Sequence, residues 1–187
     1  MKRTLLCGLA AILVPGALAA QQPAASSSSS SSPTTEAARR MSSHFGKLLT
    51  ASADEVPADK LSYKPTDAQM TFGHVWAHLA SANFHICSAI GGTAAPDQPK
   101  HDGTEAKDVL VKSLKDSFAY CDKILGQTDD SALGEQIDLG FMKGTRALAM
   151  FIYVEDLADH YSQVANYMRL NDMLPPSARN GGEGEGE

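Results

Sequence analysis

The chain has 187 residues, in which 16 lysines and arginines stand against 22 aspartates and glutamates, and its formal net charge is −6 at pH 7. An acidic chain of this kind lacks the basic surface that nucleic-acid binding requires, so we expect no nucleic-acid partner. No internal repeat is visible, and the length suits one ordinary domain with one hydrophobic core.

The N-terminus is typical of a secretory signal. Lys2 and Arg3 precede an apolar run over 5–18, and Ala17-Leu18-Ala19 provides a small-residue cleavage site. We therefore expect a signal peptide over 1–19 and an exported protein, periplasmic or secreted. The apolar run is too short to span a bilayer, so no transmembrane segment is expected in the mature chain.

Two further segments have compositions that cannot bury enough apolar area to offset the entropy lost on ordering. Residues 20–35 are dominated by serine, alanine and proline, and we interpret them as a disordered linker. Residues 179–187 are interpreted as a disordered acidic tail, in which 181–187 consist of glycine and glutamate alone. The predicted domain is 36–178.

Apolar residues recur at helical spacing in four segments of this domain, and no segment shows the alternation of a half-buried strand. The predicted fold class is therefore all-α, a four-helix bundle. The connection over 56–70 carries two prolines and is predicted to be a loop, and 126–140 is predicted to be irregular. The predicted helices are 36–53, 71–90, 104–125 and 144–171.

The second predicted helix opens at Thr71, a good N-cap, and closes at Gly91-Gly92. Projection at 100° per residue gathers one apolar stripe, formed by Phe72, Val75, Leu79, Ala82, Ile86 and Ile90. Four polar side chains lie together on one flank of that stripe: His74, His78, Ser81 and His85.

The fourth predicted helix carries Asp156 and His160, which are one turn apart and can bind one cation together. Both fall on the flank shared with Tyr153 and Tyr167, beside a predicted buried stripe of Ala147, Met150, Phe151, Val154, Leu157, Tyr161, Val164 and Met168. A third ligand has to come from elsewhere, and the histidine-bearing flank of the second helix is the best source. Our hypothesis is that these two helices meet and that His78, Asp156 and His160 hold a divalent metal ion.

Each ligand candidate also has a plainer interpretation. His78 and His160 could be hydrogen-bonded histidines in a helix interface, and Asp156 could be a surface carboxylate of an acidic helix. Asp159 is a candidate to orient a histidine rather than to bind the metal. His74, one turn before His78, could replace a missing ligand or carry protons, although a partly exposed histidine at the mouth of the site is the simpler interpretation.

The remaining histidines and two aromatic residues carry less information. His85 is about 10 Å along the axis from His78, which is too far to share its metal in a straight helix. His44 and His101 give no signal. Trp76 and Tyr161 are expected in the core.

Several short motifs resemble those of the DinB-like (DinB/YfiT) superfamily. They are the run Thr71-Phe72-Gly73-His74-Val75-Trp76-Ala77-His78-Leu79-Ala80, the pairs His160-Tyr161 and Tyr167-Met168, and Pro175-Pro176-Ser177. The resemblance covers almost the whole domain. It implies a bundle with up-down-down-up topology and a divalent metal bound by one histidine of the second helix and an i, i+4 pair of the fourth.

Carried over position by position, the resemblance assigns ligand roles to His78 and His160. The family most often has histidine where this chain has Asp156, which leaves two interpretations, a site of two histidines and one carboxylate or a site that has lost a ligand. The first set suits zinc, nickel, iron or manganese without selecting one.

Two cysteines, Cys87 and Cys121, remain after the predicted signal peptide, and an exported chain favours pairing them. A tight antiparallel hairpin of the second and third helices would hold them about 20 Å apart. The topology that the resemblance implies makes these helices parallel and brings both cysteines near the same end, and the loop 91–103 is long enough to return the chain. We therefore expect a disulfide, with two free buried thiols as the alternative.

Two functions follow from these expectations. The first is an exported metal-dependent enzyme, because the resemblance implies thiol-dependent transferases and isomerases or hydrolases. A cytosolic thiol would be a poor cosubstrate outside the cytoplasm, and no residue identifies the small-molecule substrate or ligand. The second is a non-catalytic module of the cell envelope that binds metal or a small ligand. A homodimer is left open, because the sequence does not specify the oligomeric state.

Overall fold

The computed structural model describes residues 32–179, and the predicted signal peptide, most of the predicted linker and the tail beyond Arg179 lie outside this range. Four long helices form the molecule, α1 (Pro33–Glu55), α2 (Phe72–Gly91), α3 (Lys107–Gln127) and α4 (Arg146–Arg169). The predicted all-α four-helix bundle is confirmed. Among residues 32–179, no helix combines the length and the hydrophobicity that a membrane span requires.

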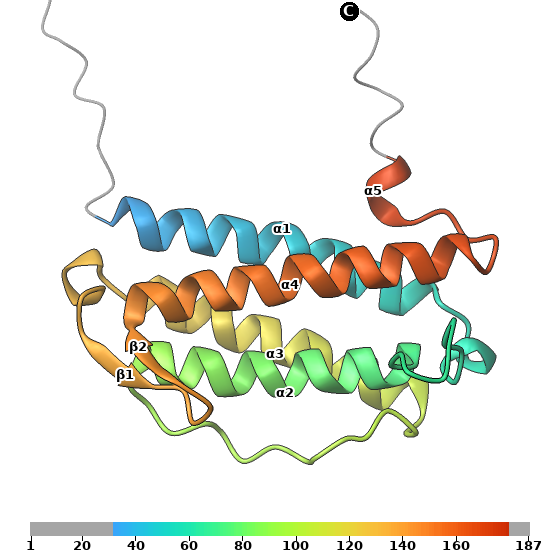
Figure 1. The fold of residues 1–187 in the computed structure, drawn as a ribbon, viewed down its shortest axis with the longest axis horizontal. Helices are drawn as coiled ribbons and strands as arrows, with labels where there is room; N and C mark the ends of the chain where they lie inside the picture. The colour runs from blue at the N-terminus through green and yellow to red at the C-terminus, as the bar shows by residue number, and fades with distance from the viewer. Residues whose placement is uncertain (1–31, 180–187) are drawn as a thin grey trace, which may run out of the picture.

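The helices run in two parallel pairs (Figure 1). α1 and α4 point one way, and α2 and α3 point the other way. This is the up-down-down-up topology. The chain returns from the end of α2 to the start of α3 through a long extended loop, residues 92–106, which lies along the outside of the bundle.

Two glycines allow the return loop to lie directly against the start of α2. A Cβ on Gly73 would be 2.1 Å from the carbonyl oxygen of Gly103, and Gly103 itself has a φ of +89°. Only glycine tolerates both this close backbone approach and this backbone conformation. The contact fixes where the parallel second pass begins.

The ends of α2 follow from local capping. The Thr71 side chain accepts a hydrogen bond from the backbone N–H of His74, and Gly92 ends the helix in the left-handed conformation with a φ of +63°. Both ends agree with the sequence prediction, because the cap residues themselves carry the signal.

α1 begins at Pro33, earlier than the predicted start at Glu36, so part of the predicted linker is helical. Proline suits the first turn of a helix because its missing N–H needs no partner there. Asp130, from the connection before α4, accepts hydrogen bonds from the backbone N–H groups of Thr34 and Thr35 at 2.9 Å. A tertiary contact therefore caps this helix.

The connection between α3 and α4 is more ordered than predicted. It contains a short 3₁₀ turn, Asp130–Ala132, and a two-stranded antiparallel hairpin of β1 (Gln136–Asp138) and β2 (Lys143–Thr145). Leu139 of this hairpin is buried, and His85 of α2 makes a 2.6 Å hydrogen bond to its carbonyl oxygen. The packing of Leu139 against α2 holds the hairpin in place.

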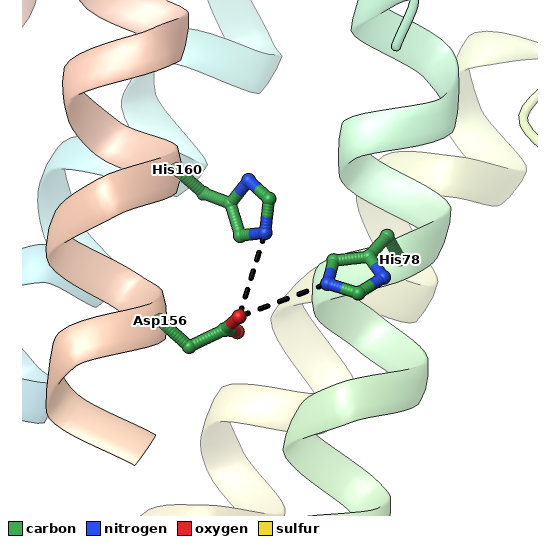
Figure 2. Close-up of side chains that lie close together, drawn as sticks. All are labelled: His78, Asp156 and His160. Carbon is green, nitrogen blue, oxygen red and sulfur yellow. Dashed lines mark ion pairs between the residues drawn. The ribbon is translucent and has the colours of Figure 1, made fainter. Parts of the chain in front are cut away.

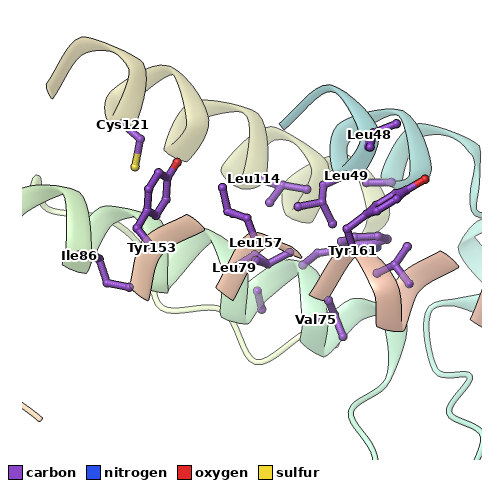
Figure 3. Close-up of a cluster of buried hydrophobic side chains, with 14 of the residues drawn as sticks. Leu48, Leu49, Val75, Leu79, Ile86, Leu114, Cys121, Tyr153, Leu157 and Tyr161 are labelled. Carbon is purple, nitrogen blue, oxygen red and sulfur yellow. The ribbon is translucent and has the colours of Figure 1, made fainter. Parts of the chain in front are cut away.

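The core lies between the four helices (Figure 3). Leu79 of α2, Leu114 of α3 and Leu157 of α4 are fully buried there, together with Leu49 of α1. Trp76 and Tyr161 are buried as expected.

The buried face of α4 differs in part from its prediction. Phe151 is 68% exposed, whereas Tyr153, placed on the flank by the sequence, is fully buried. α4 packs against both α1 and α2, so its buried face is centred between these neighbours. The Tyr153 hydroxyl shares a 2.7 Å hydrogen bond with Ser42 of α1, which satisfies the buried polar atom.

Cys87 of α2 and Cys121 of α3 form a disulfide, with their Cα atoms 5.4 Å apart. The expected pairing is therefore found. It requires the parallel arrangement of α2 and α3, because only then do the two positions lie at the same level of the bundle.

A short C-terminal helix, α5 (Pro176–Arg179), folds back on the bundle. The Tyr161 hydroxyl accepts a hydrogen bond from the backbone N–H of Ser177 at 2.9 Å, and Arg179 pairs with Glu55 at the end of α1. Arg179, which the sequence assigned to the tail, is therefore part of the ordered fold.

Candidate metal site

α4 presents Asp156 and His160 on its side toward α2. Thr145 caps this helix through a 3.2 Å hydrogen bond from the backbone N–H of Leu148, and no proline or glycine interrupts the helix before Arg169. The regular helical rise therefore stacks Asp156 and His160 one above the other.

α2 supplies His78 from the facing helix. Val75 and Leu79 are both fully buried, and their packing sets the rotation of α2 so that His78 points toward α4. Figure 2 shows the three side chains meeting in the space between the two helices.

The three side chains converge on a small volume. The Asp156 Oδ1 atom lies 3.4 Å from His160 Nε2 and 3.7 Å from His78 Nε2. The two imidazole rings are 4.7 Å apart between their centroids, and all three donor atoms lie within 4.8 Å of one another. The structure therefore brings these three residues together, as the sequence hypothesis expected. Their role as metal ligands stays a prediction.

These spacings fit ligands of one ion. Nitrogen and oxygen ligands bind zinc at about 2.1 Å, so two ligands at tetrahedral angles lie about 3.4 Å apart. The two Asp156–histidine distances are close to this value, and the nitrogen atoms of the two histidines lie within 4.8 Å of each other. Because only three protein donors are involved, coordination positions would remain for water or a ligand.

Exposure differs across the cluster. The His160 side chain is 9% exposed, that of Asp156 is 24% exposed and that of His78 is 36% exposed. Solvent therefore reaches the cluster from the side of His78, and His160 forms its inner wall.

Gln163 orients the buried histidine. His160 Nδ1 lies 3.0 Å from Gln163 Oε1, and Gln163 Nε2 donates to the Tyr167 hydroxyl at 2.7 Å. With Gln163 in this orientation its carbonyl accepts the Nδ1 proton of His160, so the neutral imidazole presents the Nε2 lone pair to the cluster, as a metal ligand must. Asp159 was predicted for this role, but its side chain is exposed and Gln163 makes the contact.

Asp156 is held as a carboxylate. Burial favours its neutral form, but the close contacts and charge interactions with His160 and His78 outweigh burial and lower its pKa to about 2. The contact with Asp156 also shifts the pKa of His160. Burial favours neutral His160, yet the contacts with Asp156 and Gln163 raise the pKa of His160 above its usual value.

One atom of the cluster is left without a partner. The Asp156 Oδ2 atom is buried, and no hydrogen-bond donor among residues 32–179 reaches it. A buried carboxylate oxygen without a partner is costly, and a bound cation would satisfy it. The donor set and this oxygen together fit a divalent ion.

The other histidines of the described chain lie outside the cluster. His74 is exposed, and the structure does not bring it into reach of a shared ion. The His85 ring is hydrogen-bonded to the Leu139 carbonyl oxygen, and His101 forms an ion pair with Glu105 at 3.1 Å. The candidate site is therefore limited to His78, Asp156 and His160.

No family model matches the sequence, and no curated protein is similar to it. Several solved structures share its fold. A DinB-like protein from Bacillus cereus superposes with a TM-score of 0.65 at 15% identity, over 75% of this chain and 95% of that one. A DinB-like protein from Bacillus subtilis, YjoA, gives a TM-score of 0.59 at 20% identity, over 73% of this chain and 95% of that one.

A third solved structure is a mycothiol-dependent maleylpyruvate isomerase. It has a TM-score of 0.58 and 14% identity, and the match covers 70% of this chain but only 60% of the longer isomerase. At these identities the comparisons establish the architecture. The described part of the chain has the four-helix fold of the DinB-like proteins.

Proposed function

We propose that the chain is an exported metal-dependent enzyme of the DinB-like superfamily, with His78, Asp156 and His160 as the ligands of one divalent ion. The observation that carries the proposal is the convergence of three donor atoms within 4.8 Å of one another, from two helices far apart in sequence. The disulfide supports export, because such bonds persist in oxidising compartments.

Each residue has a distinct part in the proposed site. His160, held by Gln163, is the fixed inner ligand. Asp156 contributes the one negative charge, and the set of two imidazoles and one carboxylate suits zinc, iron, manganese or nickel without selecting among them. His78 is the ligand on the solvent side, so a substrate approaches past it.

A bound divalent ion would act as a Lewis acid, lowering the pKa of a water or thiol and polarising a carbonyl. Compared with a third imidazole, Asp156 donates more negative charge, so a water in the site would be less acidic. The fold is shared with an isomerase that depends on a thiol, mycothiol. For an exported chain we favour water over a cytosolic thiol as the activated group, which makes hydrolysis the preferred reaction class.

Metal analysis tests the proposal directly. Protein purified without a histidine tag is analysed by inductively coupled plasma mass spectrometry, beside His78→Ala and Asp156→Ala. We expect about one metal ion per chain in the parent protein and a loss of bound metal in both variants. His74→Ala is the matched control, since it removes an exposed histidine of the same helix and should keep the metal.

The outcomes separate the alternatives. Absence of metal from the parent protein after loading with zinc or manganese would remove the proposed function. Loss of metal with His78→Ala but not with Asp156→Ala would make Asp156 a bystander. Stoichiometric metal without hydrolysis of a panel of ester and amide substrates would favour the second function, a metal-binding module of the cell envelope.

A further inference from the structure

The return loop over 92–106 lies along the outside of the bundle (Figure 1), and a groove of about 580 Å³ separates it from α2 and α3. α2 lines the groove with Ala77, Ala80 and Ser81, and α3 adds Ser113. Pockets that bind small molecules usually have volumes of about 300–1,000 Å³. The groove is therefore large enough for a small organic ligand.

The return loop is fixed at both ends and free between them. At its start, the backbone N–H of Thr93 donates to the Ser88 carbonyl oxygen at 3.0 Å, and near its end Gly103 packs against the backbone of Gly73. Residues 94–100 make no hydrogen bond with the rest of residues 32–179, and two prolines keep this stretch extended. A loop of this length without regular structure is uncommon in a compact domain and usually functional.

His101 lines the groove with a fixed imidazole. Its side chain is only 12% exposed, and its Nδ1 atom lies 3.1 Å from Glu105 Oε1. Glu105 also accepts hydrogen bonds from the backbone N–H groups of Asp102 and Gly103, at 3.2 Å and 3.0 Å. Burial alone would raise the pKa of Glu105, but these hydrogen bonds and the one from His101 outweigh burial and lower it.

The ionised Glu105 determines which nitrogen of His101 is left for a ligand. A carboxylate can only accept hydrogen bonds, so the Nδ1 atom of His101 carries a proton and donates it to Glu105. The Nε2 atom of His101 makes no hydrogen bond within residues 32–179. The imidazole is thus oriented by one partner and has its second nitrogen available in the wall of the groove.

The charges that line the groove are opposite to those of the chain as a whole, whose formal net charge is −6. Lys100 contributes an ammonium group, and His85 and His101 contribute imidazoles, against the single carboxylate of Asp97. Lys100 forms no ion pair within residues 32–179. An unpaired cation beside an imidazole on an acidic protein favours an anionic ligand.

We propose that the groove beneath the return loop is a binding site for a small organic carboxylate with an apolar body. The carboxylate contacts the Lys100 ammonium group and the Nε2 atom of a protonated His101, whose Nδ1–H stays on Glu105. The apolar body lies against Ala77 and Ala80 of α2 and the prolines of the loop. None of the three candidate metal ligands lines the groove, so this site is separate from the metal cluster.

Titration of the isotope-labelled whole chain with benzoate, followed by two-dimensional ¹⁵N–¹H NMR, tests the proposal. We expect saturable shifts centred on residues 77–85 and 94–101, with a Kd on the order of 1 mM, because a ligand of this size gains limited binding energy. Benzamide has a similar shape without the charge and should bind about 10-fold more weakly. Shifts that do not saturate, or equal binding of benzamide, would overturn the proposal.

Substitutions in the groove identify the contacts. Lys100→Ala and His101→Ala should each weaken benzoate binding about 5- to 10-fold, as expected for the loss of one charged contact. Ser81→Phe adds a ring from an exposed position and should fill the groove and abolish binding. Lys123→Ala is the matched control, because Lys123 is an exposed lysine of α3 outside the groove.

Thermal unfolding of each variant checks that the fold is retained. Undiminished benzoate binding in the folded Ser81→Phe variant, or in a folded variant that combines Lys100→Ala with His101→Ala, would contradict the proposal.

One further variant separates this site from the proposed metal site. His78→Ala removes a candidate metal ligand and should bind benzoate as the parent protein does, whether or not the parent protein holds metal. Loss of benzoate binding in His78→Ala, or shifts confined to the surroundings of Asp156 and His160, would show that the probe binds at the metal cluster and would overturn the separate site.

Discussion

His160 is the residue whose environment is most completely determined in the candidate site. It is nearly buried, Gln163 binds its Nδ1 atom at 3.0 Å, and Asp156 faces its Nε2 atom at 3.4 Å. A glutamine–imidazole contact of this kind holds the ring and its tautomer before any ion arrives. Affinity for metal should therefore depend on a residue that never contacts the ion.

We expect Gln163→Leu to lower metal affinity about 10- to 100-fold, because partners that orient a ligating histidine typically contribute that much. Isothermal titration of the metal-free protein with zinc measures the change. Asp159→Asn is the comparison, since Asp159 acts on His160 only through its charge, and it should change the affinity by a few-fold at most. A larger effect from Asp159→Asn than from Gln163→Leu would reverse the assignment.

The metal-free protein should be most stable in mildly acidic solution. The pKa of His160 is raised, so its contribution is complete below about pH 6.5 and is lost as the pH rises through the raised value. The pKa of Asp156 is lowered to about 2, so its contribution is complete above about pH 4 and is lost as the pH falls toward 2.

Urea unfolding of the chelator-treated protein from pH 3 to pH 9 measures this dependence. Asp156→Asn should flatten the profile, because it removes the partner that shifts His160. An unchanged profile in Asp156→Asn would show that the two groups do not interact in the folded state.

At the scale of single residues, the three candidate ligands could be identified from the sequence, but Gln163, which orients His160, could not. Asp156 and His160 were recognisable from their one-turn spacing, and His78 from its place on the histidine-bearing flank of the second helix together with the resemblance. Gln163 was missed because glutamine is common on helix surfaces, and its spacing from His160 and Tyr167 becomes meaningful only when both are known to be buried.

At the scale of elements, the ends of a helix were predicted correctly where capping residues in the local sequence determine them. α2 begins and ends as expected because Thr71 and Gly92 are caps in their own right. α1 begins early because a carboxylate distant in sequence, Asp130, binds its first amides. The β1–β2 hairpin was missed because its strands have three residues each and depend on the burial of Leu139.

The link between α2 and α3 should contribute strongly to stability. The disulfide joins cysteines 34 positions apart. Closing a loop of that length restricts the unfolded chain, and the expected contribution is about 4 kcal/mol. Reduction under native buffer conditions should lower the free energy of unfolding by about this amount, as measured in urea.

Cys87→Ala/Cys121→Ala supplies the control for that experiment. It should unfold like the reduced parent protein and should not respond to the reductant. A parent protein whose stability is the same with and without reductant would show that the two thiols are not joined in solution.

At the scale of the whole molecule, the parallel arrangement of α2 and α3 connects the site to the disulfide. The return loop brings α3 alongside α2 in the same direction, which pairs Cys87 with Cys121 and leaves the other side of α2 to face α4. His78 is on that other side. Helical periodicity predicts the helices but not their directions. The topology was therefore predicted from the resemblance to the DinB-like superfamily.

In the proposed site, α2 and α4 bind one ion between them. Anomalous diffraction at the zinc edge, from crystals grown with zinc, tests it most directly. We expect a single strong peak between the two helices, at about 2.0–2.2 Å from His78 Nε2, from His160 Nε2 and from an oxygen of Asp156. A zinc peak elsewhere on the molecule with none between these three side chains would contradict it.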